Sequence, residues 1–230
     1  MIATVEKVSK IFKSRLLAFG CNYLIGIVAI LVLIGWVFDL NALKSISPTF
    51  TTMKVSAALM FVMSAVMNHT MLTWKKQLSD IRAGVMGTMM MSLLIFSLLM
   101  IMDLLTKEKM GFTEILKEDS GTIFTVKGGA PCIMTVLLFL VHSFTGLCYI
   151  FNTDKMPKRL IRFATITLLT AVIAIVGYVL WIPTMFYYIK HYSSAMALHS
   201  AILFILNSYI VMTIANDYTN HNEHSNNVSL

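Results

Sequence analysis

The stretch SSAMALHSAILFILNS, residues 193–208, contains one ionisable side chain, His199, near the start of an apolar run. Histidine changes charge near neutral pH, and its ring nitrogens donate or accept hydrogen bonds and bind metals. Ionisable groups at membrane depth are costly, so each one raises a hypothesis of function. Two interpretations of His199 stay open: it binds a ligand, or it only caps and packs the start of a helix.

Four further polar side chains within the apolar runs are candidates for a role: Asn22, His69, His142 and, in the same stretch as His199, Asn207. Because a helix rises about 1.5 Å per residue, the three histidines of the apolar runs fall at different depths. A haem or metal site needs ligands that converge, so we expect no metal and no cofactor. Hydrogen bonds to a neighbouring helix are the expected role of His69, His142 and the two asparagines.

The cysteines and methionines offer no better catalytic or metal chemistry. Cys21, Cys132 and Cys148 lie in or beside apolar runs, at no spacing typical of metal ligands. The 18 methionines are spread over most of these runs, which favours flexible packing over soft-metal binding. The sequence contains no serine, cysteine or carboxylate arrangement suited to nucleophilic or acid–base catalysis, and no glycine loop that could cradle phosphate. We therefore expect that the protein is not an enzyme.

The elements that carry these residues are predicted to be membrane-spanning helices. Of the 230 residues, 57% are hydrophobic and 13% are charged, and the mean hydropathy is +0.78. A spanning helix needs about 20 consecutive apolar residues. Six uncharged runs reach this length, and none shows the alternating polarity of a β-barrel strand. The predicted spans are residues 16–38, 55–74, 83–102, 128–153, 163–189 and 192–216.

The distribution of charge predicts the topology. The net charge of +7 comes from basic residues at the ends of apolar runs rather than on a soluble basic face, so we expect no nucleic-acid partner. Most of the Lys and Arg residues fall in three alternate segments, residues 7–15, 75–82 and 155–162, and such segments favour the cytoplasmic side. The sequence thus predicts an all-α, multi-pass protein with both termini cytoplasmic. Its parts are a basic N-terminal segment (1–15), a six-helix membrane domain (16–216) and a disordered polar tail (217–230).

A short motif recurs at the starts of the second, fourth and sixth predicted helices. MKVSAALMF (53–61), GAPCIMTVL (129–137) and MALHSAILF (196–204) align, and they place Ser56 and Cys132 opposite His199. We therefore predict three parallel helical-hairpin repeats, at about 16–75, 83–153 and 163–216. Three helix N-termini would then meet at the outer side, where backbone N–H groups favour an anion or another acceptor. The alternative is coincidence, since small residues followed by apolar ones are common in membrane helices.

Two longer segments carry a family resemblance. GWVFDLNALKSISPTFTTMKVSAALMF and MFYYIKHYSSAMALHSAILFILNS resemble the membrane-embedded N-terminal sensor regions of bacterial PAS-containing histidine kinases and diguanylate cyclases. In that family the final repeat often reads Met-Ala-Leu-His-Thr-Ala, and residues 196–201 read MALHSA. Val55 stands where the family usually has proline, whereas the middle copy has Pro131 but lacks the initial methionine. The resemblance implies a sensory domain of the bacterial inner membrane, here without an output module.

The combined expectation is an integral inner-membrane sensory or ligand-binding domain without catalytic activity. Its candidate ligand-binding residues are His199, Ser56 and Cys132. Its expected partners are the lipid bilayer, a small-molecule ligand, and either a signalling protein or further copies of the chain. Two alternatives stay open: a small membrane transporter or carrier, which internal repeats also fit, and a membrane haem or redox protein.

Overall fold

The computed structural model describes residues 2–47, 49–73, 80–105, 124–126, 129–151, 155–190 and 192–228, and over these ranges its regular elements are all helical. Six long helices are joined by loops that contain the short helix α2 (Asn41–Lys44) and the single 3-10 turn η1 (Pro183–Phe186). The long helices are α1 (Ile2–Val37), α3 (Val55–Leu72), α4 (Asp80–Leu105), α6 (Ile133–Phe151), α7 (Met156–Leu180) and α8 (Leu198–Val228).

All six long helices are long and apolar enough to cross a bilayer, which confirms six spans near the predicted places. The fifth differs most in its bounds, since it covers Met156–Leu180 rather than residues 163–189, and the sixth begins at Leu198 rather than at residue 192. A helix satisfies its own backbone hydrogen bonds, so it is the expected structure for an uncharged run in lipid. The structure differs from the prediction at the C-terminus. Residues 217–228, for which we expected disorder, continue α8 as helix, and so their backbone groups are paired within the helix.

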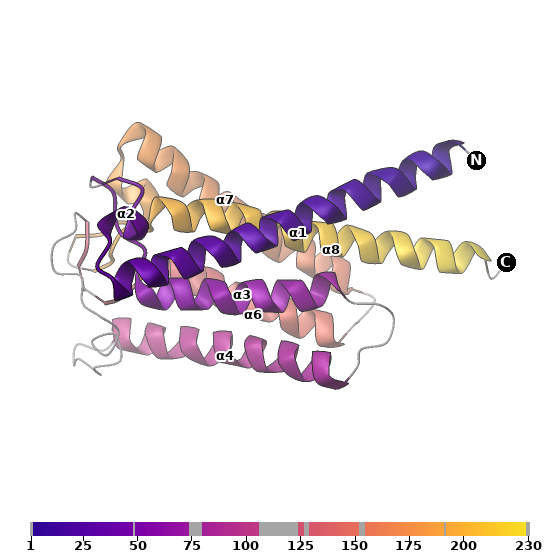
Figure 1. Ribbon diagram of the computed structural model, residues 1–230, viewed down its shortest axis with the longest axis horizontal. Helices are drawn as coiled ribbons and strands as arrows, with labels where there is room; N and C mark the ends of the chain where they lie inside the picture. Colours follow the sequence, from indigo (N-terminus) through magenta and orange to yellow (C-terminus); the bar gives the residue numbers. More distant parts are fainter. Residues whose placement is uncertain are drawn as a thin grey trace.

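The six long helices form two groups that differ in burial. In the inner helices α3, α6 and α8, 61%, 50% and 67% of the spanning window is buried, against 28%, 28% and 33% in the outer helices α1, α4 and α7. Each inner helix packs against the outer helix that precedes it and against one further outer helix. The chain termini lie at the same end of the bundle, and the inner helices all begin at the opposite end (Figure 1). The outer helices leave many large apolar side chains exposed, as a surface that faces lipid requires.

The inner helices share a buried stripe with alternating spacings of four and three residues, as in the a and d positions of coiled coils. Phe61, Phe139 and Phe204 occupy the second place of the stripe on α3, α6 and α8, and each is fully buried. Their ring centroids are 4.7 Å, 4.9 Å and 4.9 Å apart, so the three rings form one closed cluster. We call this cluster the phenylalanine ring. The stripe residues are Ala57, Phe61, Ser64, Asn68 and Met71; Thr135, Phe139, His142, Gly146 and Tyr149; and Ser200, Phe204, Asn207, Val211 and Ile214.

The turns after α1 and α7 have the same local structure. The carbonyl oxygens of Gly35 and Gly177 accept hydrogen bonds from the backbone N–H groups five residues later, at 2.8 Å and 2.9 Å. Asp39 and Trp181, each four residues after the glycine, have φ values of 58° and 57°, in the left-handed region. A one-turn helix follows in each case, α2 or η1.

The extended segments that lead into α3 and α8 are also held in the same way. The N–H groups of Met53 and Met196 donate to carbonyl oxygens of α2 and η1, each at 2.9 Å. Their own carbonyl oxygens accept from aromatic side chains of the preceding outer helix, Trp36 Nε1–H at 2.8 Å and Tyr178 O–H at 2.7 Å. These matching contacts fix where both inner helices begin.

We predict that Gly177→Ala destabilises the protein because its α7 backbone packs tightly on η1. An added Cβ would lie 2.6 Å from Met185 Cβ and 2.9 Å from two backbone atoms. Overpacking of this kind costs about 1–3 kcal/mol, more than the roughly 1 kcal/mol that alanine gains in a helix. The melting temperature in detergent should fall by several degrees. Gly87→Ala on α4 is the matched control, since a Cβ there meets nothing within 4 Å; equal melting temperatures would contradict the close approach.

Candidate functional site

The starts of the three inner helices surround a small cavity at the end of the bundle opposite the chain termini. Extended segments at 51–54, 130–132 and 194–197 lead into α3, α6 and α8. The cavity between them measures about 10 Å³, close to the space that one water molecule needs. Its lining residues are Thr52, Met53, Lys54, Ala57, Pro131, Cys132, Thr135, Ala195, Ala197 and Ser200. Ala57, Thr135 and Ser200 hold the first place of the stripe on their helices, so the cavity lies directly outside the phenylalanine ring.

Lys54 brings a positive charge to this cavity. Its side chain is buried, and Nζ donates to the hydroxyl oxygens of Thr52 and Thr125, both at 3.2 Å. Lys54 is also the N-cap residue of α3, so its ammonium group adds to the positive end of the helix dipole. Together with the other helix starts, this charge makes the cavity a favourable place for an anion or a hydrogen-bond acceptor.

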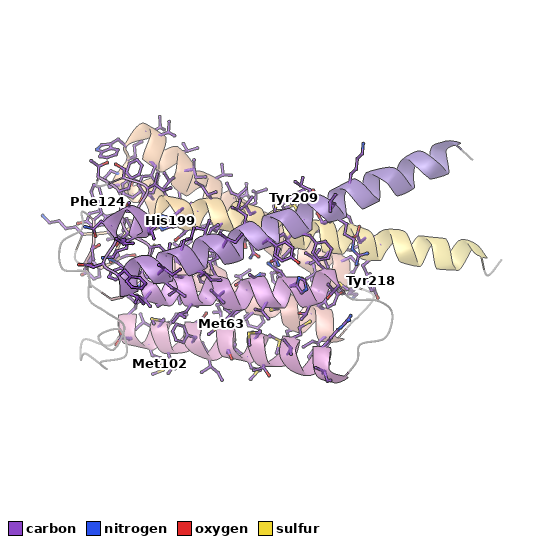
Figure 2. The ribbon with its side chains drawn as sticks, viewed as in Figure 1. Met63, Met102, Phe124, His199, Tyr209 and Tyr218 are labelled. Carbon is purple, nitrogen blue, oxygen red and sulfur yellow. The ribbon has the colours of Figure 1, made fainter. Side chains whose placement is uncertain are left out.

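Ser56 and His199 are each the second residue of an inner helix, and both are buried. Within the part of the chain that the structure describes, Ser56 Oγ and both ring nitrogens of His199 lack a hydrogen-bond partner. Leaving a buried polar group unsatisfied costs about 1–3 kcal/mol, so such groups call for a ligand or water. The two side chains stand one position before the cavity-lining residues Ala57 and Ser200. His199 is labelled in Figure 2, at the start of α8.

Cys132 lines the cavity, but it does not occupy the place that the sequence alignment gave it. Because α3, α6 and α8 begin at Val55, Ile133 and Leu198, counting from the helix starts puts Met134 opposite Ser56 and His199. Phe139, not Leu137, completes the phenylalanine ring, which requires the same shift. By helix start and by packing, residues 131–139 rather than 129–137 therefore correspond to residues 53–61 and 196–204. Cys132 instead precedes α6, with its Sγ 3.8 Å from Ser193 Oγ.

The remaining polar side chains lie deeper in the bundle. Asn22 on α1 donates from Nδ2 to the carbonyl oxygen of Ala65 on α3 at 3.1 Å. Asn207 on α8 lies 3.0 Å from His142 Nδ1 on α6 and 2.6 Å from Asn68 Nδ2 on α3.

His69 lies apart from the other two histidines of the apolar runs. It is near the inner end of α3, where its ring contacts Phe19 and Tyr23 with centroids 5.9 Å and 6.0 Å away. The structure therefore does not bring His69, His142 and His199 together. Among the described residues, no cluster of three His, Cys, Asp or Glu side chains could hold a metal ion.

Several residues of the cavity, and one of the polar side chains deeper in the bundle, were not identified from the sequence. Lys54 stands within the repeated motif, and its charge beside an apolar run was a visible signal. Thr135 could be found only with a different register for the middle motif, whereas the alignment of residues 53–61 with 196–204 already set Ser200 opposite Ala57. Asn68 stands inside the second apolar run, next to the histidine that was singled out.

Burial raises the pKa of the Cys132 thiol above its ordinary value. Hydrogen bonds from neighbouring groups, among them Ser193, offset the increase only in part, because loss of solvent around the thiolate is the larger effect. Cys132 therefore stays protonated at neutral pH and is a weak nucleophile.

We predict that a variant with Cys132 as its only thiol (Cys21→Ala, Cys148→Ala) reacts slowly with iodoacetamide at neutral pH. Only the thiolate reacts, and a raised pKa moves thiolate formation to higher pH. The rate should therefore rise about tenfold per pH unit and show no plateau up to pH 9. The same variant unfolded in SDS is the control and should level off at an ordinary thiol pKa. A plateau at or below pH 8.5 in the folded protein would contradict the buried thiol.

Comparison with known proteins adds no assignment to this geometry. No family model, curated protein or solved structure matches the chain. The functional argument therefore rests on the cavity, on the buried polar side chains around it, and on the arrangement of the inner helices.

Proposed function

We propose that the chain is an integral membrane sensory or ligand-binding domain without catalytic activity, and that its ligand binds where α3, α6 and α8 begin. One observation carries the proposal: Ser56 and His199 are buried, each precedes a cavity-lining residue of its helix, and neither side chain has a hydrogen-bond partner among the described residues. Buried polar groups in folded proteins are almost always hydrogen-bonded, so these two groups need a partner. A ligand that accepts and donates hydrogen bonds would satisfy them.

The chemistry around the cavity favours a small anion or another hydrogen-bond acceptor. Donors come from Lys54 Nζ and from the hydroxyl groups of Thr52, Thr135 and Ser200. The three helix N-termini add N–H groups and a positive dipole end. Because the cavity is only water-sized, a larger ligand would have to separate the extended segments. Binding would then favour a different arrangement of the inner helices, as a sensor requires.

Three parallel hairpin repeats, related by an axis along the membrane normal, would explain why the three inner helices begin at the same end of the bundle. The units are α1 with α3, α4 with α6, and α7 with α8, and each pair is in contact. The shared stripe on the inner helices and the phenylalanine ring support the repeats. The matching turns after α1 and α7 support the relation of the first unit to the third. The ligand site would lie on the axis.

Helix α8 is the route by which binding would reach the other end. It starts with His199 and Ser200 and runs without a break to Val228, and its C-terminal part projects from the bundle (Figure 1). Before this projecting part begins, α8 contacts α1, because Tyr209 O–H donates to the Ser14 carbonyl oxygen at 3.4 Å. The receiver would be a signalling protein, an output module or another copy of the chain.

The membrane would be a bacterial inner membrane, with both termini in the cytoplasm. Lys13, Arg15 and Arg82 and a cluster at residues 155–162 belong to the helix ends on the side of the termini. An excess of basic residues on one side is typical of the cytoplasmic face of a membrane protein.

The proposed topology predicts the activity of reporter fusions in bacterial cells. Green fluorescent protein fused after Leu230 should fluoresce, since it folds in the cytoplasm, and alkaline phosphatase at the same place should be inactive. Alkaline phosphatase fused after Ser47, in the loop between α1 and α3, should be active because that loop faces the periplasm. The reverse pattern would contradict the orientation.

The proposed ligand site predicts an anion-dependent stability that depends on His199. Melting temperatures of the wild type would be measured with acetate, bicarbonate and inorganic phosphate. A ligand at 100 times its Kd stabilises the folded state by about 2.7 kcal/mol. His199→Ala should raise the Kd of the stabilising anion about tenfold or more, since one buried hydrogen bond is lost. His69→Ala is the matched control and should keep the wild-type response. If the anion raises the melting temperature of His199→Ala as much as that of the wild type, His199 does not bind the anion.

A further inference from the structure

A second polar region lies inside the bundle, about one turn from the phenylalanine ring along α6 and α8 and about two turns from it along α3. Asn68 on α3 donates from Nδ2 to Asn207 Oδ1 on α8 at 2.6 Å. Asn207 Nδ2 in turn lies 3.0 Å from His142 Nδ1 on α6. The three side chains, at most 2% exposed, form one hydrogen-bonded chain across all three inner helices. We call them the polar layer.

At both ends of this hydrogen-bonded series, a polar atom lacks a hydrogen-bond partner. Because Asn207 Nδ2 donates, His142 Nδ1 accepts, and the proton of the neutral ring is on Nε2. His142 Nε2 and Asn68 Oδ1 have no hydrogen-bond partner among the described residues. One end therefore offers a donor and the other an acceptor, both in an apolar surrounding where each costs about 1–3 kcal/mol.

Reassigning the side chains does not remove this deficit. If both amides are turned by 180° and His142 carries its proton on Nδ1, the same heavy atoms form the chain in the opposite direction. The ends then become an Asn68 Nδ2 donor and a His142 Nε2 acceptor. In either direction one donor and one acceptor are left, one at each end, and water can satisfy both because it donates and accepts hydrogen bonds.

We propose that the polar layer is an internal binding site for water, closed from the outer cavity by the phenylalanine ring. Water is the smallest molecule that donates and accepts hydrogen bonds, and buried waters typically make about three bonds to such groups. Phe61, Phe139 and Phe204 come from the same three helices and are fully buried, so they form the barrier on the outer side. This site does not depend on the ligand proposed for the cavity.

The experiment uses the full chain in lipid nanodiscs with labelled histidine, and NMR identifies which ring nitrogen of His142 carries the proton. His142→Phe assigns the signal by its loss, and single Gln variants of the five other histidines assign it by elimination if His142→Phe does not fold. The expected result is a cross-peak between bound water and the Nε2 side of the ring, from Nε2–H itself or, if Nδ1 carries the proton, from the ring C–H groups beside Nε2. A His142 signal without any water contact overturns the proposal.

The barrier is tested by exchange of the same proton in D₂O. Phe204→Leu opens the ring, and exchange should become about tenfold faster or more. Phe144→Leu on α6 is the matched control, since Phe144 is 41% exposed and outside the ring, and it should leave the rate unchanged. Phe61→Leu replaces Phe204→Leu if that variant does not fold. If the proton exchanges at the same rate in Phe204→Leu and Phe144→Leu, the three phenylalanines do not close the site, and this part of the proposal is wrong.

Discussion

The mutual contact of Phe61, Phe139 and Phe204 is the interaction on which the remaining structure depends. In lipid, helices gain little from hydrophobic burial against each other, so tight packing and polar contacts decide how they associate. Three aromatic rings in T-shaped and tilted contact join the three inner helices at one level. This contact fixes the register of the inner helices, and with it the cavity on the outer side and the polar layer on the inner side.

Among the residues that the structure describes, the buried Lys and Asp side chains, Lys44, Lys54 and Asp103, lie at the end of the bundle opposite the chain termini. Lys44 and Lys54 are both nearly inaccessible there, and each is held by oxygen atoms: Lys44 by Asp39 and Asn41, and Lys54 by threonine hydroxyls. The middle of the inner bundle uses neutral amides and an imidazole instead. This division follows the cost of desolvation, because a charged group in the membrane interior costs more than a neutral polar group that is hydrogen-bonded.

The sequence predicted the six spans well, because an uncharged run of about 20 residues has few other stable structures in lipid. It could not separate inner from outer helices, since lipid-facing and core-facing positions are both apolar. It also misplaced the middle motif. The match at GAPCIMTVL rested on small residues, and only the contact of Phe139 with the two other rings shows that the copy is two residues later. The partners of His142 and Asn207 likewise depend on that register.

Helix α8 links every level of the bundle. Ser200 lines the cavity, Phe204 belongs to the phenylalanine ring, Asn207 is the middle of the polar layer, and Tyr209 contacts α1. These residues follow each other within three turns of one continuous helix, so a rotation or shift at its first turn changes contacts at each level. Asn207 is the sensitive point, because both of its amide atoms are engaged with different helices. A displacement that breaks either bond leaves another buried polar group unsatisfied, so these two bonds oppose movement of α8 along or about its axis.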